Sequence, residues 1–512
     1  MKFLQKNWLI LSFAALKFLL HYVFQRPDFE LHRDEYLYFE MGKHLAWGYF
    51  EVPPMIAFEG FLANLFGGSE SVLRFFPYFF GATTLFFVGK ITQNLGGKYF
   101  AQSLACVCFL AVPFTRINML FQPNSLEILL FTLVFYFLVK FIQTQNPQNF
   151  IWIGVLIGLS VLNKYTTFVF IISIILGFLL TPLRKNLLKK HFFFGILAAF
   201  IIVLPNLIWQ IQHHFPFFEH IRLLKKYQLS YISPIEAIKN QLIICMVSII
   251  IWAAGLFAVL FSDKFKPFRI IGIVFLAGIF IINFQQGKPY YTLGYFPILF
   301  AFGSVFLEQI QRKKERFWLK YLYFLMPIGI TLWLSVISYP MFSPEKTAEM
   351  SQKYKFLGVL QGEQGQQYPM PQDYIDMQGW QEMADKVYGG FQKLSPSQQA
   401  KTAIICGNYG QASAINYFNR NRKMPEAICI NNTFIFWISP EKLNFQNVII
   451  VDDEPDNVFA LHFKTYQKID EVKNALAREK GTQILVATDA DSVVHHHVQQ
   501  EYDDLRKRFF EK

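Results

Sequence analysis

Charged residues are scarce in this chain. Asp, Glu, Lys and Arg make up 16% of its 512 residues, whereas hydrophobic residues make up 53%. Soluble domains typically carry about 25% charged residues, so the composition excludes an ordinary soluble enzyme and indicates a membrane protein. The shortage of charge ends after Tyr339 and Pro340, where the sequence becomes polar. We therefore predict a membrane domain over residues 1–339 and a soluble domain over residues 340–512.

Several sequence signatures are also missing. We find no internal repeat, which many transporters carry. The glycines of "GNYGQASAINYF" fit neither the dinucleotide-binding fingerprint nor the P-loop. The net charge of +12 comes from short basic clusters between apolar runs rather than from one basic face. This pattern is typical of membrane topology, and it excludes nucleic acid as a partner.

Cysteine is rare, with five residues in the chain. Cys106, Cys108 and Cys245 fall in apolar stretches, where we expect them to be small core residues. Cys406 and Cys429 fall in the polar third, where an oxidising compartment would permit a disulfide. Two cysteines in a domain of this size are also often free, so both alternatives stay open.

Eleven apolar stretches approach the roughly 20 residues that a membrane-spanning helix needs. With the N-terminus in the cytoplasm, most basic clusters between the stretches fall on the cytoplasmic side, as the positive-inside rule expects. This topology places the first loop, residues 26–71, and the polar third on the outer face. The stretches are residues 7–25, 72–90, 100–116, 121–140, 150–162, 165–182, 191–211, 240–261, 269–285, 290–308 and 317–338.

The polar third has the pattern of a small α/β fold. Its apolar runs "TAIICG", "NVIIVDD" and "TQILVATD" have the length of strands. "GWQEMADKVYGGFQKL" and "DEVKNALAREK" have helical spacing, and "GNYGQASAINYF" predicts a turn followed by a helix. The alternation of these patterns predicts a soluble α/β domain behind a polytopic α-helical membrane protein.

The segment "LHRDEYLYFEMGKHLAWGYFEVPP" follows the first apolar stretch and places acidic residues among aromatic ones. Tyr38, Met41 and Leu45 have helical spacing, which predicts an amphipathic helix along the membrane surface. Asp34 and Glu35 stand at its N-terminal end, where carboxylates are favourable for electrostatic reasons alone. The functional alternative is that a carboxylate here acts as general base towards an acceptor hydroxyl or amine.

A general base in group transfer needs a counter-charge for the leaving group. The cations expected on the outer face can provide it: Arg33, Arg74, Lys164 (in an Asn-Lys-Tyr turn), Arg222 and Lys288. Both residue types suit phosphate recognition, Arg as a bidentate donor and Lys as a point charge. The alternative for each is an ordinary solvated or snorkelling cation.

Four further side chains are candidates to line the same cavity. Tyr290 and Tyr291 follow Lys288 and belong either to an interfacial aromatic belt or to the cavity. For His44 a solvated surface histidine is the commoner case. His213 stands beside His214, and adjacent histidines rarely converge on one ion, which favours a polar loop over a metal site. The sequence offers no metal-ligand set with convincing spacing.

Four stretches, in order along the chain, resemble a known family. They are "DEYLYFEMGKHLAWGYFEVPP", "GLSVLNKYTTFVF", "LPNLIWQIQHHFPFFEHI" and "GKPYYTLGYFPILFAFG". They are similar to membrane glycosyltransferases of the GT-C superfamily, in the bacterial branch related to dolichyl-phosphate-mannose–protein mannosyltransferases and to the lipid A aminoarabinose transferase. "PQDYIDMQGWQEM" and "GNYGQASAINYF" resemble the outer domain of one bacterial branch.

The resemblance implies transfer of a sugar, with inversion, from a polyprenyl-phosphate donor to an envelope acceptor (a glycan, lipid or protein). The site would lie on the outer face of a bacterial inner membrane, with a periplasmic C-terminal domain. The family's base falls on Asp34, with Glu35 beside it. The family usually has a polar residue where Val52 precedes Pro-Pro, so the expected donor-phosphate contacts shift to Lys164 and Lys288.

The resemblance fixes no cofactor, although a divalent metal ion can assist some members of the superfamily. The alternative function is a transporter or flippase that moves lipid-linked sugars without transfer chemistry. Such a protein would use the same cations and aromatic side chains, but it would need no general base.

Overall fold

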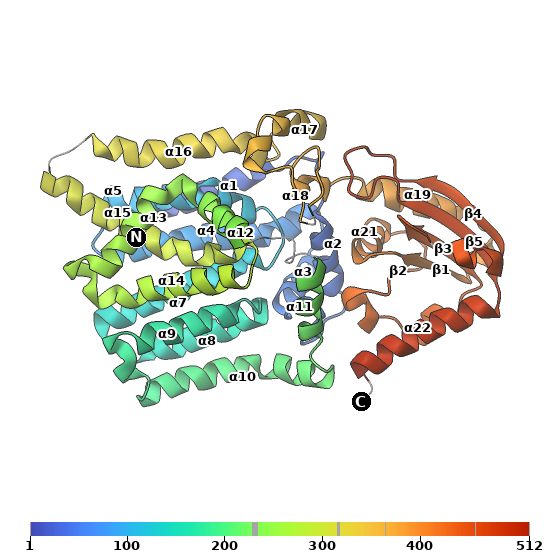
Figure 1. Cartoon of the computed structure of the whole chain (residues 1–512), viewed down its shortest axis with the longest axis horizontal. Helices are drawn as coiled ribbons and strands as arrows, with labels where there is room; N and C mark the ends of the chain where they lie inside the picture. The colour runs from blue at the N-terminus through green and yellow to red at the C-terminus, as the bar shows by residue number, and fades with distance from the viewer. Residues whose placement is uncertain (1, 228–233, 315–317, 364, 456, 511–512) are drawn as a thin grey trace.

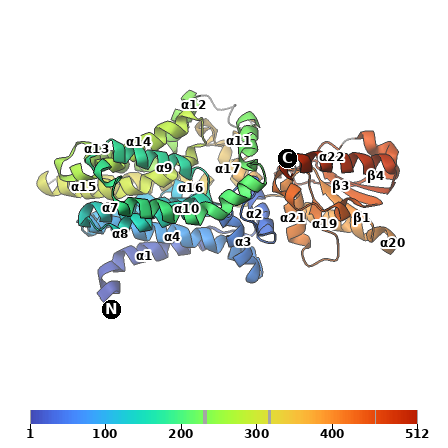
Figure 2. The same ribbon diagram turned by 90° about the horizontal axis from the view of Figure 1, so that it is seen from below.

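The fold is taken from a computed structural model that describes residues 2–227, 234–314, 318–363, 365–455 and 457–510. A bundle of helices and a smaller domain built around a sheet lie end to end along the long axis (Figure 1). The second view, turned by 90°, shows the same two parts, with the N-terminus at the end of the bundle far from the sheet (Figure 2).

Every predicted apolar stretch corresponds to a helix. Within the described residues, seven helical segments are long and apolar enough to cross a membrane, and four of the predicted stretches form shorter apolar helices. The prediction of a polytopic helical membrane protein is therefore confirmed. The helices of this part are α1 (Lys2–Phe24), α2 (Arg33–Met41), α3 (Met55–Leu65), α4 (Glu70–Asn94), α5 (Tyr99–Leu110), α6 (Val112–Ile117), α7 (Asn124–Thr144), α8 (Gln148–Asn163), α9 (Thr167–Leu179), α10 (Lys190–Gln212), α11 (Pro216–Tyr227), α12 (Pro234–Ile244), α13 (Ile249–Phe261), α14 (Arg269–Phe284), α15 (Phe296–Lys314) and α16 (Leu319–Ser338), with 3-10 turns η1 (Pro182–Asn186), η3 (Met246–Ser248), η4 (Asp263–Phe268) and η5 (Pro289–Tyr295).

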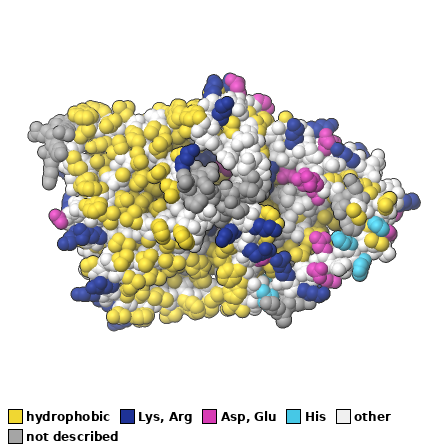
Figure 3. All heavy atoms as spheres, in the orientation of Figure 1, with side chains coloured by type: hydrophobic (Ala, Val, Ile, Leu, Met, Phe, Trp, Pro, Cys, Tyr) yellow, Lys and Arg dark blue, Asp and Glu magenta, His cyan; other side chains and the backbone are white. Residues whose placement is uncertain are grey.

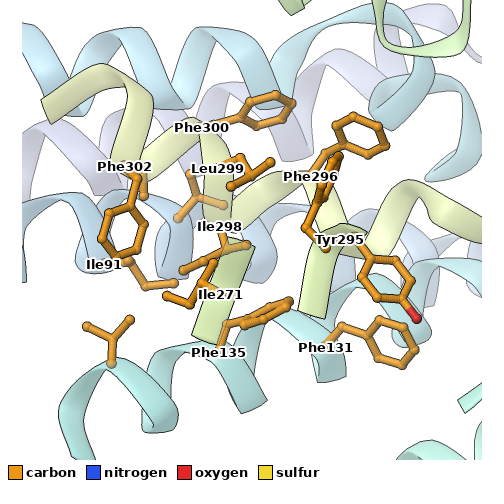
Figure 4. Packing of buried hydrophobic residues seen from close by; sticks show 14 of the residues in the cluster. Ile91, Phe131, Phe135, Ile271, Tyr295, Phe296, Ile298, Leu299, Phe300 and Phe302 are labelled. Atoms are coloured by element: carbon orange, nitrogen blue, oxygen red, sulfur yellow. The ribbon is translucent and has the colours of Figure 1, made fainter. Parts of the chain in front are cut away.

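The bundle buries its core around α15. Figure 4 shows Ile298 and Leu299 of α15 among Phe131 and Phe135 of α7 and Ile271 of α14. Apolar side chains also cover much of the outside of the bundle in the face shown, while Lys and Arg gather at its far end and at the junction with the second domain (Figure 3). An apolar belt between charged ends is the surface that a bilayer requires.

The second domain is a mixed five-stranded sheet of order β2-β1-β3-β5-β4. Strands β1, β2 and β3 are parallel to one another, and β5 pairs antiparallel with β3 and β4. The cores place α19 and α21 against one face of the sheet and the start of α22 against the other. The elements are α17 (Pro344–Gln352), η6 (Lys355–Leu357), α18 (Gln372–Ile375), α19 (Trp380–Gln392), α20 (Pro396–Gln399), β1 (Thr402–Cys406), α21 (Tyr409–Asn419), β2 (Ala427–Ile428), η7 (Asn432–Phe436), η8 (Pro440–Leu443), β3 (Asn447–Asp452), η9 (Asn457–His462), β4 (Phe463–Glu471), β5 (Gln483–Ala490) and α22 (Ser492–Phe510).

The three predicted strands and the turn-plus-helix after the first are confirmed as β1, β3, β5 and α21. The predicted helix over "DEVKNALAREK" is wrong, because β4 extends to Glu471 and turns follow. The backbone N–H groups of Lys473 and Asn474 donate to the Glu382 carboxylate of α19, at 2.9 and 3.1 Å, instead of to a helix. Cys406 and Cys429 are buried and free.

The predicted surface helix of the first loop is shorter than expected and buried. Helix α2 ends at Met41, and the next residue, Gly42, packs so closely against the α3 backbone that a Cβ there would lie 2.4 Å from the carbonyl carbon of Gly60. Leu45, predicted on the apolar face, is 50% exposed beyond the helix end. Tyr36 and Phe39 instead pack against Tyr417 of α21. Helix α2 therefore lies between the two domains rather than along a lipid surface.

A glycine crossing holds α15 against α13, and we predict that it tolerates no side chain. A Cβ on Gly303 would lie 1.9 Å from the carbonyl oxygen of Ile251, so Gly303→Ala must push two helices apart. Overpacking of this kind costs about 1–3 kcal/mol, and we expect a lower melting temperature in detergent. The matched control is Gly329→Ala in α16, where a Cβ meets no atom within 4 Å; it should leave the melting temperature unchanged or raise it.

Candidate active site

A cavity of about 870 Å³ lies where one end of the helix bundle meets the second domain. The first loop, the turn after α8, the segment before η5 and the second domain all contribute to its wall. Side chains with chemistry on this wall include Asp34, Glu51, Lys164, Lys288 and Tyr409. The contacts described in the following paragraphs are those of side chains on this wall and next to it.

Asp34 lies in the first turn of α2 and faces the cavity. Its Oδ1 accepts a hydrogen bond from the Tyr409 hydroxyl at 2.8 Å, and the Arg33 Nε lies 3.7 Å from the same oxygen. Burial alone would raise the pKa of Asp34, but the neighbouring His32 and Arg33 side chains and the Tyr409 hydrogen bond hold it below its usual value. Asp34 is therefore ionised at neutral pH and able to accept a proton.

Glu35 lies on the other side of the helix and does not line the cavity. It is 0% exposed, and its oxygens accept the backbone N–H groups of His32 at 2.6 Å and of Phe121 at 2.7 Å. Arg74 lies 3.6 Å from it and donates to the Glu30 carbonyl at 3.0 Å. Glu35 and Arg74, predicted as a catalytic and a phosphate-binding residue, thus fix the first loop instead of facing the cavity.

The two predicted lysines do face the cavity, together with the two tyrosines. Lys164 donates to Asn124 Oδ1 at 2.6 Å and to Glu127 Oε2 at 3.2 Å, and its Nζ lies 4.5 Å from the ring centre of Tyr291. Lys288 forms an ion pair of 2.6 Å with Glu363. Burial would lower the pKa of Lys288, but Glu363 keeps it above its usual value. Lys288 is therefore charged.

Three other predicted residues lie away from the cavity wall. Arg222, on α11, is 58% exposed in its side chain and pairs with Glu219. The His44 ring stacks on Trp437, and the His213 ring stacks on Trp209. The helical spacing of a segment does not show which of its faces packs against the second domain, so the positions of these three residues could not be predicted from it.

A network that the sequence did not reveal joins the first loop to the second domain. Asp376, which follows α18, accepts from Arg478 at 3.0 Å, and its other oxygen lies 3.5 Å from His32 Nε2. The carboxylates of Asp376 and Asp34 raise the pKa of His32 to about 9 against the effect of burial. His32 Nδ1 lies 3.1 Å from the Asp34 backbone nitrogen and accepts its N–H only in the neutral ring, so this cap of α2 and the cationic form that the two carboxylates favour exclude one another. The only sequence signal for Asp376 was its position in "PQDYIDMQGWQEM".

Glu51 is a second carboxyl on the cavity wall that sequence reasoning passed over. Its Oε1 accepts the backbone N–H of Thr433 at 2.9 Å, while its buried Oε2 has no hydrogen-bond partner among the described residues. Burial raises the pKa of Glu51 to about 7. Its neighbour Val52 lies on the same wall and brings no charge.

We predict that Glu51 makes stability depend on pH. The folded protein keeps the Glu51 proton up to about pH 7, whereas the unfolded chain loses it near the usual pKa of 4.5. The contribution of Glu51 to stability therefore falls as pH rises from 4.5 through 7. Glu51→Gln should raise the unfolding free energy at pH 8 by on the order of 1 kcal/mol or more and change it least at pH 5.

Thermal unfolding of both proteins in detergent from pH 5 to pH 8 measures this difference. The comparison at pH 5 is the internal control, since both side chains are then neutral in the folded protein. Parallel melting curves across the whole range would contradict the prediction.

The comparisons with known proteins agree with this geometry. The family model described as dolichyl-phosphate-mannose-protein mannosyltransferase matches residues 51–209. The fold is similar to crystal structures of ArnT from Cupriavidus metallidurans. With the form bound to undecaprenyl phosphate the TM-score is 0.62 at 13% identity, over 93% of this chain and 97% of that one. With the apo form the TM-score is 0.59 at 13% identity, over 94% and 98%. No curated protein matches the chain in sequence.

Proposed function

We propose that this chain is a multi-pass membrane glycosyltransferase of the GT-C superfamily, related to the dolichyl-phosphate-mannose–protein mannosyltransferases and to ArnT, and that it transfers a sugar from a polyprenyl-phosphate donor to an envelope acceptor. Asp34 is the general base of this reaction. The observation that carries the proposal is one cavity wall with an ionised carboxylate, two lysines and an apolar end.

The apolar end of the cavity suits a polyprenyl chain. Phe168 and Ile172 of α9 line the cavity and are also about half exposed on the outside of the bundle. In a bilayer this part of the bundle faces lipid, so a lipid-linked donor can enter sideways. The crystal structure of ArnT with undecaprenyl phosphate supports a ligand of this class.

The proposed step needs only side chains on this wall. The acceptor hydroxyl or amine gives its proton to Asp34 as its oxygen or nitrogen forms a bond to the anomeric carbon. The bond from that carbon to the donor phosphate breaks, and the phosphate leaves with the electron pair. Lys164 and Lys288 stabilise the added negative charge. Direct attack opposite the leaving group inverts the anomeric carbon.

We further propose that the protein lies in a bacterial inner membrane with its C-terminal domain in the periplasm. The second domain lies at the end of the bundle away from the N-terminus (Figure 2), and the cavity is lined by residues of both parts, which agrees with the topology drawn from the positive-inside rule. Within the part of the chain that the structure describes, no group of three or more His, Cys, Asp and Glu side chains is arranged for a metal ion. A requirement for a divalent metal stays a prediction of the resemblance.

The first test compares Asp34→Asn with the wild type, with bound lipid identified by native mass spectrometry. When the wild type is incubated with envelope extract, we expect its bound lipid to lose the sugar and to remain as free polyprenyl phosphate. Asp34→Asn should slow transfer by about 100-fold or more, since general base catalysis contributes about that much. It should still bind the intact donor.

The transporter alternative gives a different result in the same experiment. A flippase would release or retain the lipid-linked sugar intact in both proteins. Equal turnover in Asp34→Asn and wild type would remove the base assignment even if transfer is seen. Circular dichroism and melting temperature show whether the variant is folded.

We also predict that Lys164→Ala and Lys288→Ala weaken donor binding. Each removes a positive charge from the cavity wall, and we expect the donor dissociation constant to rise about 10-fold, as for loss of a charged hydrogen bond. Titration with polyprenyl phosphate measures the change. Lys225→Ala is the matched control, because Lys225 is exposed on α11 and does not line the cavity. An equal loss in all three variants would indicate a general effect of surface charge.

A further inference from the structure

The second domain presents the carboxyl ends of its parallel strands to the cavity. Tyr409 follows β1 and Asn432 follows β2, and both line the cavity wall. In open α/β sheets, ligands bind outside the carboxyl ends of the strands, where neighbouring connections run to opposite faces. The second domain therefore meets the first loop with the edge that other α/β domains use for their ligands.

Tyr409 is the first residue of α21, and its position is closely defined. The Asn408 side chain caps the helix by accepting the Gln411 N–H at 3.1 Å, and the Gln411 side chain accepts the Gly407 N–H at 3.0 Å. Gln411 in turn donates to the buried Glu479 at 2.6 Å. This capping box leaves the start of α21 little freedom.

The Tyr409 side chain contacts both charged residues at the start of α2. Its hydroxyl donates to Asp34 Oδ1 at 2.8 Å, and the Arg33 guanidinium carbon lies 4.9 Å from its ring centre. The next residue, Gly410, also packs closely against Arg33, since a Cβ on Gly410 would lie 2.5 Å from Arg33 Cγ. One oxygen of Asp34 is thus held by the second domain. Asp34 Oδ2 lies 3.9 Å from His32 Nδ1, beyond hydrogen-bond distance.

We propose that Tyr409 is a positioning residue for the general base, so that the C-terminal domain is part of the active site. Its hydroxyl holds Oδ1 and leaves Oδ2 to take the acceptor proton. This inference rests on the proposed function of Asp34.

The hydroxyl also affects the ionisation of the base. Burial raises the pKa of Tyr409 well above its usual value, so the hydroxyl remains a donor wherever the enzyme works. Burial also opposes ionisation of Asp34, and the Tyr409 hydrogen bond is one of the interactions that offset it. Removing the hydroxyl should therefore raise the pKa of Asp34. The charged and titratable groups that act on Asp34 from the elements around it are His32, Arg33, Tyr38, Glu51, Lys288, Asp376 and Tyr409.

The test is the pH profile of kcat/KM for Tyr409→Phe, which keeps the ring over Arg33 and removes only the hydroxyl. We expect the acidic limb to move to higher pH and kcat to fall by about 10- to 100-fold, since a misplaced base loses attack geometry. The KM for the lipid donor should stay unchanged. Tyr417→Phe is the matched control, because Tyr417 lies on the same helix, packs on α2 and does not line the cavity.

A second variant gives the opposite shift. Incorporation of 3,5-difluorotyrosine at position 409 makes the hydroxyl a stronger donor, and it should move the acidic limb to lower pH. An acidic limb that is unmoved in both variants would overturn the proposal, as would an equal shift in Tyr417→Phe.

An infrared measurement separates this inference from the proposed function. The carboxylate band that is absent from Asp34→Asn reports the pKa of Asp34 without any turnover. If the wild type transfers no sugar, the proposed function has failed. The infrared titration then still supports the contact if Tyr409→Phe raises the pKa of Asp34, and contradicts it if that pKa is unchanged.

Discussion

The junction between the helix bundle and the second domain depends on the start of helix α2. Two buried acidic residues hold it, one to the bundle and the other to the second domain. Glu35 binds it to the membrane bundle through backbone N–H groups of the loop itself and of Phe121. Asp376 binds it to the second domain, by accepting the Arg33 N–H through its carbonyl and by facing His32 with its carboxylate. A buried carboxylate is costly unless its oxygens are satisfied, so these contacts are hard to exchange for others. Asp34 lies between the contacts of Glu35 and those of Asp376, and one of its carboxylate oxygens takes part in neither.

Lys164 and Lys288 on the cavity wall are each already paired with a carboxylate in this structure. Lys164 faces Glu127, which is 5% exposed in its side chain, whereas Lys288 faces Glu363, which is 39% exposed. Separating Lys164 from Glu127 would leave a charge buried in the bundle, which is expensive. Glu363 can turn towards water at little cost. A donor phosphate would therefore replace Glu363 on Lys288 more readily than it would replace Glu127 on Lys164, and the two lysines need not contribute equally.

Hydropathy was enough to find the bundle, because a spanning helix must be apolar along its length, and every predicted stretch proved helical. Asp34, Lys164 and Lys288 could be predicted on the cavity wall because they lie between apolar stretches, where loops of the same face come together, and Tyr290 and Tyr291 begin the stretch that follows Lys288. Tyr409 and Asp376 could not, since their contacts with the first loop join residues more than 300 positions apart, and Arg478 joins this network through Asp376. Local spacing also failed at "DEVKNALAREK", where sheet pairing of β4 overrides helical propensity.

The position of Val52 bears on the sides from which the donor and the acceptor approach in the proposed reaction. It lies on the cavity wall in the first loop, where the resemblance leads one to expect a polar contact with the donor phosphate. Here Lys164 and Lys288 stand on the turn after α8 and before η5, while Arg33 and Arg478 bring further positive charge to the side of the second domain, next to Tyr409. An inverting step needs the acceptor and the leaving group on opposite faces of the sugar. If the donor phosphate binds at the lysines, as proposed, the acceptor would come from the side of the second domain, and Asp34, which contacts that domain through Tyr409, would stand where the acceptor proton is released.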